Sequence, residues 1–223
     1  PQTDAETLAL AGKSGKVTGP SLTVAAKNMK PKSGGIFDPN IFGPDKQRWG
    51  FIELAAPMPN PIFADSIATL VGLGNKHDIQ KVVSGEMKLN GKSGGEAIRE
   101  ALAKVNVDQA MKRYKAQMDD PKVKGTELNN AVFAYKSLRA LKEHGKAPVD
   151  AYTMRYLPVL PPLYRPFQES TEGDDRIDPL NQLYRRLGMV NTSLETSRKE
   201  GIPERRLLKA QGDLYLEMQN LFG

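Results

Sequence analysis

The stretch that decides the fold is residues 157–222, which opens with LPVLPPLYRP, a run holding four prolines. A polar, acidic loop follows at 168–178, and then two helical patterns of similar length separated by Gly201-Ile202-Pro203. Apolar spacings of three and four predict an antiparallel helical hairpin with a coiled-coil seam. Gly201 suits the end of the first arm and Pro203 the first turn of the second. The seam positions are Leu180, Leu183, Leu187, Val190 and Leu194, then Leu207, Gln211, Leu214, Met218 and Leu221.

Composition is that of an ordinary soluble protein, with 39% hydrophobic and 26% charged residues in 223. No apolar run approaches the roughly 20 residues of a membrane helix, and no signal peptide is visible. Cysteine is absent, which excludes disulfides and thiolate metal sites. His77 and His144 are too scattered for a metal centre and are expected to be surface residues.

Positive charge is concentrated near the N-terminus. The net charge is +6, and residues 13–48 hold seven cations against Asp38 and Asp45. This basic arm is either a solvated segment or a nucleic-acid contact. Residues 12–35 are rich in glycine, serine and lysine, which predicts an extended segment held by partners.

The middle of the chain predicts a small helical domain. Residues 62–73 indicate a buried helix with Ile62 and Ile67 on its inner face, and residues 79–83 a strand. Further helices are expected from Gly95, over 107–118, and from a cap at Thr126 to Gly145. The triplet Gly91-Lys92-Ser93 is not a P-loop, because Glu86 stands where its first glycine is required.

Several short motifs follow one another along the chain. They are residues 34–44 (GGIFDPNIFGP), 50–57 (GFIELAAP), 157–162 (LPVLPP), Arg165-Pro166, 180–186 (LNQLYRR) and Pro203-Glu204. In this order they resemble the largest catalytic subunit, β′, of multisubunit RNA polymerases, and the resemblance covers residues 15–223. In that family the proline-rich strand, the polar loop and the helical hairpin are the clamp base, the lid and the clamp helices.

Two departures from the family concern metals. Only residues 45–49 stand where the family has its cysteine-bearing zinc ribbon, so zinc binding is not carried over. The family's catalytic aspartates lie downstream of the clamp helices, so we expect them, and the Mg²⁺ they hold, on another chain. We interpret Asp174, Asp175 and Asp178 as a solvated acidic loop. No cofactor is expected on this chain, which would be one subunit of a nucleotidyltransferase.

The resemblance implies nucleic-acid contacts in and near the lid, residues 167–179. Phe167 would stack on a base and Arg176 would meet phosphate, although the family's lid arginine aligns with Asp174. Two alternatives stay open: Phe167 is a core residue, or Arg185 and Arg186 form a charged outer face. The candidate nucleic-acid contacts are Lys27, Lys30, Lys32, Arg165, Phe167, Arg176, Arg185 and Arg186.

The clamp helices of the bacterial family dock a promoter-specificity (sigma) factor. The family's contact positions fall here on Leu208, Ala210 and Gly212, and of its first-arm polar run only Asn191 remains. A divergent or dedicated factor, or none, is therefore expected. Our candidates for docking are Asn191, Arg198, Arg205 and Arg206.

The sequence therefore predicts a mixed α/β, mostly α chain. Its expected parts are an extended segment (1–61), a helical clamp domain (62–150), a strand with the lid (151–179) and the hairpin (180–223). The favoured function is the N-terminal β′ fragment of a split polymerase, encoded by a bacteriophage and working in the infected cytoplasm or packaged in a virion. Its partners would be a β-like subunit, the catalytic β′ fragment, template DNA and the RNA–DNA hybrid. The alternatives are a β′-like decoy that binds sigma or polymerase subunits, and a plain coiled-coil scaffold.

Overall fold

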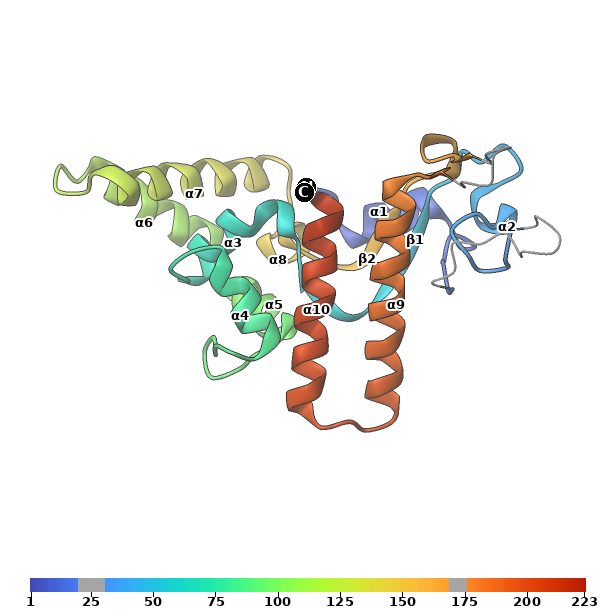
Figure 1. Cartoon of the computed structure of the whole chain (residues 1–223). Coiled ribbons are helices and arrows are strands. Elements are labelled where there is room, and N and C mark those ends of the chain that lie inside the picture. Colours follow the sequence, from blue (N-terminus) through green and yellow to red (C-terminus); the bar gives the residue numbers. More distant parts are fainter. Residues whose placement is uncertain (20–30, 169–175) are drawn as a thin grey trace. The chain divides into compact units, whose positions relative to one another are not determined.

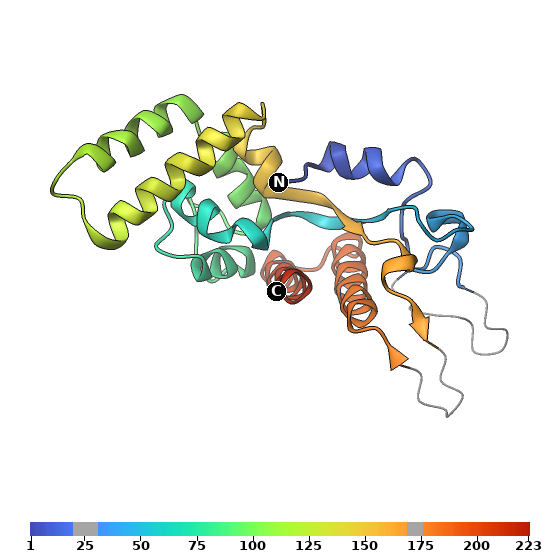
Figure 2. The same cartoon turned by 90° about the horizontal axis from the view of Figure 1, so that it is seen from above.

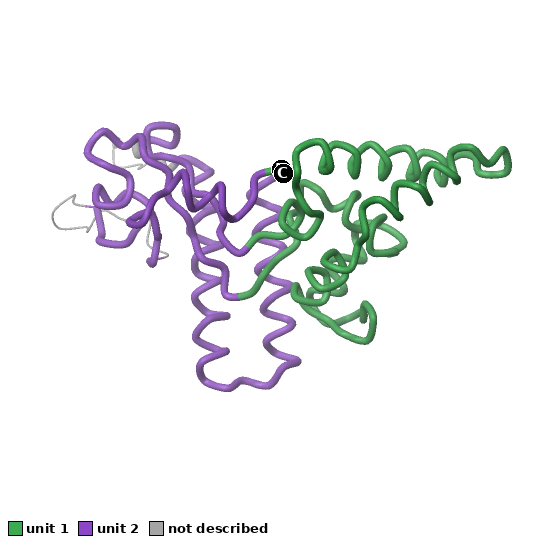
Figure 3. Tube along the Cα trace, turned by 180° about the vertical axis from the view of Figure 1, so that it is seen from behind, with its two compact units in different colours: residues 1, 56–154 green, residues 2–55, 155–223 purple. Residues whose placement is uncertain are grey.

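The computed structural model describes residues 1–19, 31–168 and 176–223. Helices predominate among them, and the predicted mixed, mostly α class is confirmed. The chain divides into two compact units, one of residues 1 and 56–154 and the other of residues 2–55 and 155–223 (Figure 3). The predicted helical domain, 62–150, falls inside the first unit. The other predicted segments fall largely in the second.

The chain passes between the units inside two strands, β1 (Gly50–Pro59) and β2 (Thr153–Val159), which pair in a two-stranded sheet. Alternate residues of β1 are buried, from Ile52 through Leu54 and Ala56 to Met58. This period of two is the signature of a strand with one covered face. Residues 50–57, one of the motifs of the resemblance, thus lie in a strand with one covered face.

The first unit is helical. A short 3-10 turn (Pro61–Phe63) leads into α3 (Ala64–Val71), followed by α4 (His77–Ser84) and α5 (Gly95–Ala103). Then α6 (Val107–Asp119) and α7 (Gly125–Glu143) form a helical hairpin, and α8 (Pro148–Tyr152) ends the unit (Figures 1 and 2). Helix α3 packs against α5 and α7, and α5 against α4 and α8.

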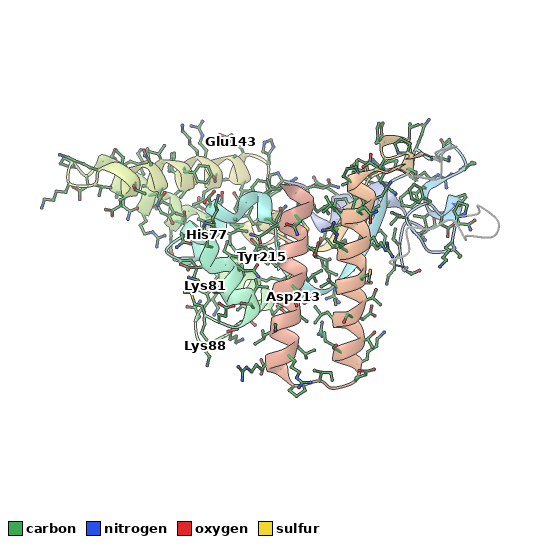
Figure 4. The ribbon with its side chains drawn as sticks, in the orientation of Figure 1. His77, Lys81, Lys88, Glu143, Asp213 and Tyr215 are labelled. Carbon is green, nitrogen blue, oxygen red and sulfur yellow. The ribbon has the colours of Figure 1, made fainter. Side chains whose placement is uncertain are left out.

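The strand predicted at 79–83 is wrong, because these residues lie in helix α4. Ile79, Val82 and Val83 are fully buried at helical spacing, while Lys81 between them is exposed. The run is too short for sequence alone to separate the two periods. His77 stands exposed at the start of the same helix (Figure 4).

Two further boundaries differ from expectation. Ile62 is 60% exposed, because the helix proper begins only at Ala64. Helix α7 begins at Gly125 with Lys124 at the cap position, so Thr126 lies inside the first turn and does not cap it. The other predicted helices of this unit start within a residue of where the periodicity placed them.

The second unit begins with α1 (Asp4–Ala11), in the segment that we expected to be extended. Thr3 accepts a hydrogen bond from the amide of Glu6, and the Glu6 carboxylate accepts one from the amide of Thr3. This reciprocal capping box was visible in the sequence as Thr-x-x-Glu. A short helix α2 (Pro39–Phe42) then leads into β1 through residues 43–49, at the place where the resemblance expects a zinc ribbon.

After β2 the chain makes a 3-10 turn (Pro162–Tyr164) and the strands β3 (Phe167–Gln168) and β4 (Arg176–Ile177). These strands pair antiparallel, with Phe167 opposite Ile177 and Gln168 opposite Arg176. Helices α9 (Pro179–Lys199) and α10 (Glu204–Phe222) then pack side by side as the predicted hairpin (Figure 1). Gly201 takes a positive φ of 69° between the arms, as its predicted role requires.

The amphipathic character of α10 is plain in two of its residues. Asp213 is exposed, whereas Tyr215 is fully buried two positions further on (Figure 4). Among the described residues, none of the helices has the combination of length and apolar character that crossing a membrane demands.

Candidate nucleic-acid interface and the buried arginine beneath it

Arg165 lies at the centre of the second unit with none of its surface exposed. Its Nε donates to the Leu160 carbonyl (2.7 Å), Nη1 to Oδ1 of Asn181 (3.0 Å) and Nη2 to the Ile36 carbonyl (2.5 Å). The Asn181 amide donates back to the Arg165 carbonyl at 3.2 Å. We predicted Arg165 as a nucleic-acid contact, but the structure places its guanidinium away from solvent and joins it to three internal acceptors.

Aromatic rings surround the guanidinium. Its central carbon lies 5.0 Å from the ring centroids of Phe37 and Phe42 and 5.5 Å from that of Tyr184. Burial lowers the pKa of Arg165 to about 10, against the opposing effects of Tyr184 and Asp178. The side chain therefore keeps its charge at neutral pH, stabilised by ring faces and carbonyl dipoles, and it forms no salt bridge with a described residue.

The same cluster fixes the proline-rich run to α9. The amide of Leu160 donates to the hydroxyl of Tyr184 (3.1 Å), which in turn donates to the carbonyl of Pro158 (3.4 Å). Burial raises the pKa of the Tyr184 phenol, so the hydroxyl keeps its proton for this bond. Three segments thus meet at Arg165: the Ile36–Phe42 loop, the proline run and the first turns of α9.

The predicted lid is described only at its base. Residues 167–168 and 176–177 form the β3–β4 ladder, whereas Asp174 and Asp175 lie outside the described residues, as do Lys27 and Lys30. The side chains of Phe167 and Arg176 also lie outside the description, so their roles stay predictions. Asp178 is the N-cap of α9: its Oδ1 accepts from the amide of Leu180 at 2.8 Å. Lys32 is exposed.

Arg185 and Arg186 stand on the exposed face of α9 together with Met189, which is 53% exposed. In the sequence of α9 no carboxylate occurs before Glu195. Among the described residues, no acidic side chain pairs with either arginine. Thr192, Ser193 and Thr196 continue this exposed surface toward the end of the helix. Two unpaired guanidinium groups followed by hydroxyls form a surface suited to phosphate oxygens.

The docking candidates separate into two pairs. Asn191 is buried: its Oδ1 accepts from the amide of Ala55 (2.7 Å), and its Nδ2 donates to the carbonyl of Glu53 (2.9 Å). Arg198 donates to the carbonyl of Ala55. These two side chains therefore form hydrogen bonds with backbone groups at the edge of β1. Because Asn191 is buried there, a partner protein cannot reach it. Arg205 and Arg206 are exposed in the first turn of α10.

A groove of about 440 Å³ lies beside this edge, within the second unit. Four cations and two carboxylates line it. Lys16 (2.6 Å) and Arg155 (3.6 Å) both pair with Glu53, and Lys199 pairs with Glu195 (2.9 Å). Ion pairs among its own lining residues therefore neutralise most of the positive charge of the groove, so it does not present an open anion site. Its lining residues are Lys16, Val17, Thr18, Glu53, Leu54, Ala55, Arg155, Asn191, Glu195, Arg198 and Lys199.

The Glu53 ion pair predicts a specific pH dependence. The hydrogen bond from Lys16, with the charges of Lys16 and Arg155, holds the pKa of Glu53 below its usual value of 4.5. Its stabilisation is therefore present above pH 4.5 and is lost as pH falls through the lowered pKa. We expect Glu53→Gln to lower the free energy of unfolding by about 0.5–1 kcal/mol at pH 7, in urea titrations. The difference from wild type should shrink as the pH falls below 4.5, and a loss that stays constant down to the acid unfolding of the protein would contradict this account.

Sequence reasoning missed the buried, structural role of two asparagines, Asn181 and Asn191, the second of which it had assigned to docking. Both lie on the inner stripe of α9 with Tyr184, Leu187 and Leu194, at spacings of three and four. A polar residue in phase with an apolar stripe was the available signal, because a buried amide requires hydrogen-bond partners. The sequence does not reveal those partners, which lie 16 and more than 130 residues away.

No family model matches the chain. Among curated proteins, the chain is similar to the β′ subunit of DNA-directed RNA polymerase from Lactobacillus acidophilus, with 26% identity over 241 aligned residues. This alignment covers 78% of the chain and 20% of the Lactobacillus subunit. The β′ subunit from Clostridioides difficile is 24% identical over 268 aligned residues, and this alignment covers 87% of the chain and 23% of that subunit. The relatives are β′ subunits.

The chain is thus similar to β′ subunits, at 24–26% identity over most of its length. The chain spans about one-fifth of the length of the β′ relatives it matches. Within the described residues, no group of three or more His, Asp or Glu side chains is placed to hold a metal ion.

Proposed function

We propose that this chain is the N-terminal β′ portion of a multisubunit DNA-directed RNA polymerase. It forms the clamp base, the lid and the clamp helices, and it contacts template DNA and the RNA–DNA hybrid. The observation that carries the proposal is the order of elements after β2 in a chain that aligns with β′ over 78% of its length. A proline-rich run, a narrow hairpin base and a two-armed helical hairpin follow one another in one compact unit.

The nucleic-acid surface in this proposal is the exposed part of α9 around Arg185 and Arg186. Their guanidinium groups have no internal carboxylate partner among the described residues, so they meet phosphate without first breaking an ion pair. Arg165 acts one layer below, by holding the proline run and α9 together. In the basic arm, Lys32 is exposed and is a further candidate contact.

Catalysis belongs to another polypeptide in this proposal. The described residues hold no cluster of metal ligands, and the Mg²⁺-binding aspartates reside on a separate β′ fragment. The aligned stretch of 241 residues exceeds the 223 of this chain, so the relatives hold residues with no counterpart here. Such extra residues, and the direct passage from α2 to β1, support the loss of the zinc ribbon. A split polymerase without this ribbon points to a bacteriophage enzyme.

Docking of a specificity factor is assigned to Arg205 and Arg206. Both are exposed at the start of α10, whereas Asn191 and Arg198 already bond the edge of β1. A factor that docks here would meet a basic surface at the tip of the hairpin, which suits acidic side chains.

Purification of the tagged chain from its natural source tests this function. We expect it to bring down a β-like subunit and a second chain bearing the aspartate motif, and the complex to synthesise RNA on DNA. Recovery of the chain with an intact host polymerase or a sigma factor, without activity of its own, would contradict the proposal and favour a decoy. Recovery of the chain alone would also contradict it.

A further inference from the structure

The β3–β4 hairpin leaves and rejoins the unit at two residues that bond each other. Strand β3 begins two residues after Arg165, and β4 ends four residues before Asn181. Arg165 donates to the Asn181 side chain, and Asn181 donates back to the Arg165 carbonyl. The bond between these residues therefore closes the base of the hairpin.

The described ladder above this base is short. Only two residue pairs form it, Phe167 with Ile177 and Gln168 with Arg176. A two-stranded hairpin is at best marginally stable in water without further packing. Among the described residues, those at its base are therefore the ones placed to orient the hairpin.

We infer that Arg165 and Asn181 form a clasp that sets the direction in which the β3–β4 hairpin leaves α9. They are positioning residues: neither is exposed, and each acts through the strand next to it. The fork of the guanidinium fixes three acceptors, on Leu160, Asn181 and Ile36, in one plane. An apolar pair of equal volume would fill the space but would not define this geometry.

Asn191 offers a matched comparison on the same helix. Like Asn181, it is a buried amide with one accepted and one donated hydrogen bond. Its partners lie on β1, so it has no bond to either stem of the hairpin. A purely structural role would make the two asparagines equivalent, whereas the clasp makes only Asn181 act on the β3–β4 ladder.

Amide hydrogen exchange, measured on the full chain, distinguishes a clasp at Asn181 from a purely structural role for both asparagines. We expect Asn181→Ala to speed, by about tenfold or more, the exchange of those backbone amides of residues 167, 168, 176 and 177 that donate across the ladder. Asn191→Ala should leave these amides unchanged and instead speed exchange at Ala55. If Asn181→Ala destabilises the fold as a whole, Arg165→Lys, which keeps the charge but loses the fork, serves as the second variant. Unchanged ladder amides in both clasp variants, or equal acceleration by Asn191→Ala, would overturn the inference.

The consequence for transcription rests on the proposed function, because the hairpin is then the lid at the upstream end of the RNA–DNA hybrid. In the assembled polymerase, nuclease footprinting should show a displaced upstream hybrid boundary for Asn181→Ala and an unchanged one for Asn191→Ala. If Asn181→Ala loosens the ladder but does not move the hybrid boundary, the inference of a clasp stands and the assignment of the hairpin as a lid fails. The two failures are therefore distinguishable.

Discussion

Arg165→Met is expected to lower the free energy of unfolding of the second unit by about 3–5 kcal/mol. The change removes all three donors and leaves the Ile36 and Leu160 carbonyls and the Asn181 Oδ1 without their partner. Each buried polar group left unsatisfied costs about 1–3 kcal/mol. Methionine fills most of the space of the arginine stem, so loss of volume contributes little.

The fluorescence of Trp49, the single tryptophan, reports this transition in a urea titration. It lies in the second unit, next to β1, and so follows the unit that the substitution affects. The matched control is Arg185→Met, the same change at an exposed position of α9, which should cost no more than about 0.5 kcal/mol. Arg165→Lys should still lose about 2 kcal/mol, because an ammonium group cannot reproduce the planar fork. Equal midpoints for the two methionine variants would refute the central role of Arg165.

Neutralising Arg185 and Arg186 together is expected to weaken nucleic-acid binding about tenfold or more in low salt. Each lost phosphate contact reduces the slope of log K against log salt by about 0.7 for single strands and about 0.9 for duplex DNA. The double variant R185Q/R186Q should therefore lose about 1.4–1.8 from this slope. Fluorescence anisotropy with labelled DNA across a series of KCl concentrations measures both quantities.

The pair Arg205 and Arg206 provides the control for this experiment. R205Q/R206Q removes the same charge from adjacent exposed positions of the other arm. Its slope should stay near that of wild type if the phosphate surface is confined to α9. If both double variants reduce the slope equally, the binding reflects net charge alone, and the assignment of Arg185 and Arg186 fails.

The helical hairpin was the most predictable part of the fold. Its apolar spacing, Gly201 and Pro203 are local signals, and α9 and α10 lie where those signals placed them. The strand predicted at 79–83 failed because three apolar residues in a short run satisfy either period. Local patterns therefore sufficed for long elements and were ambiguous for short ones.

The candidate site was harder to predict, because its residues meet from distant parts of the chain. The sequence marked Arg165 by its motif but gave no sign that Ile36, 129 residues earlier, accepts its hydrogen bond. Asn191 and Arg198 read as polar residues on a helix, and only the position of β1 shows that they bond its edge. The exposure of Arg185 and Arg186, by contrast, follows from their phase on the helix relative to Tyr184 and Leu187.

The discontinuity of the second unit has a consequence for how the protein is made on the ribosome. Residues 56–154 are contiguous and complete a compact unit as soon as they emerge, whereas the N-terminal 55 residues lack their partners on α9. The bond from Ala55 to Asn191 spans 136 residues, a delay of about 7–27 s at common elongation rates of about 5–20 residues per second. Throughout that interval β1 carries an uncovered edge, so the nascent chain is expected to depend on a chaperone, or on rapid translation, more than the finished protein does.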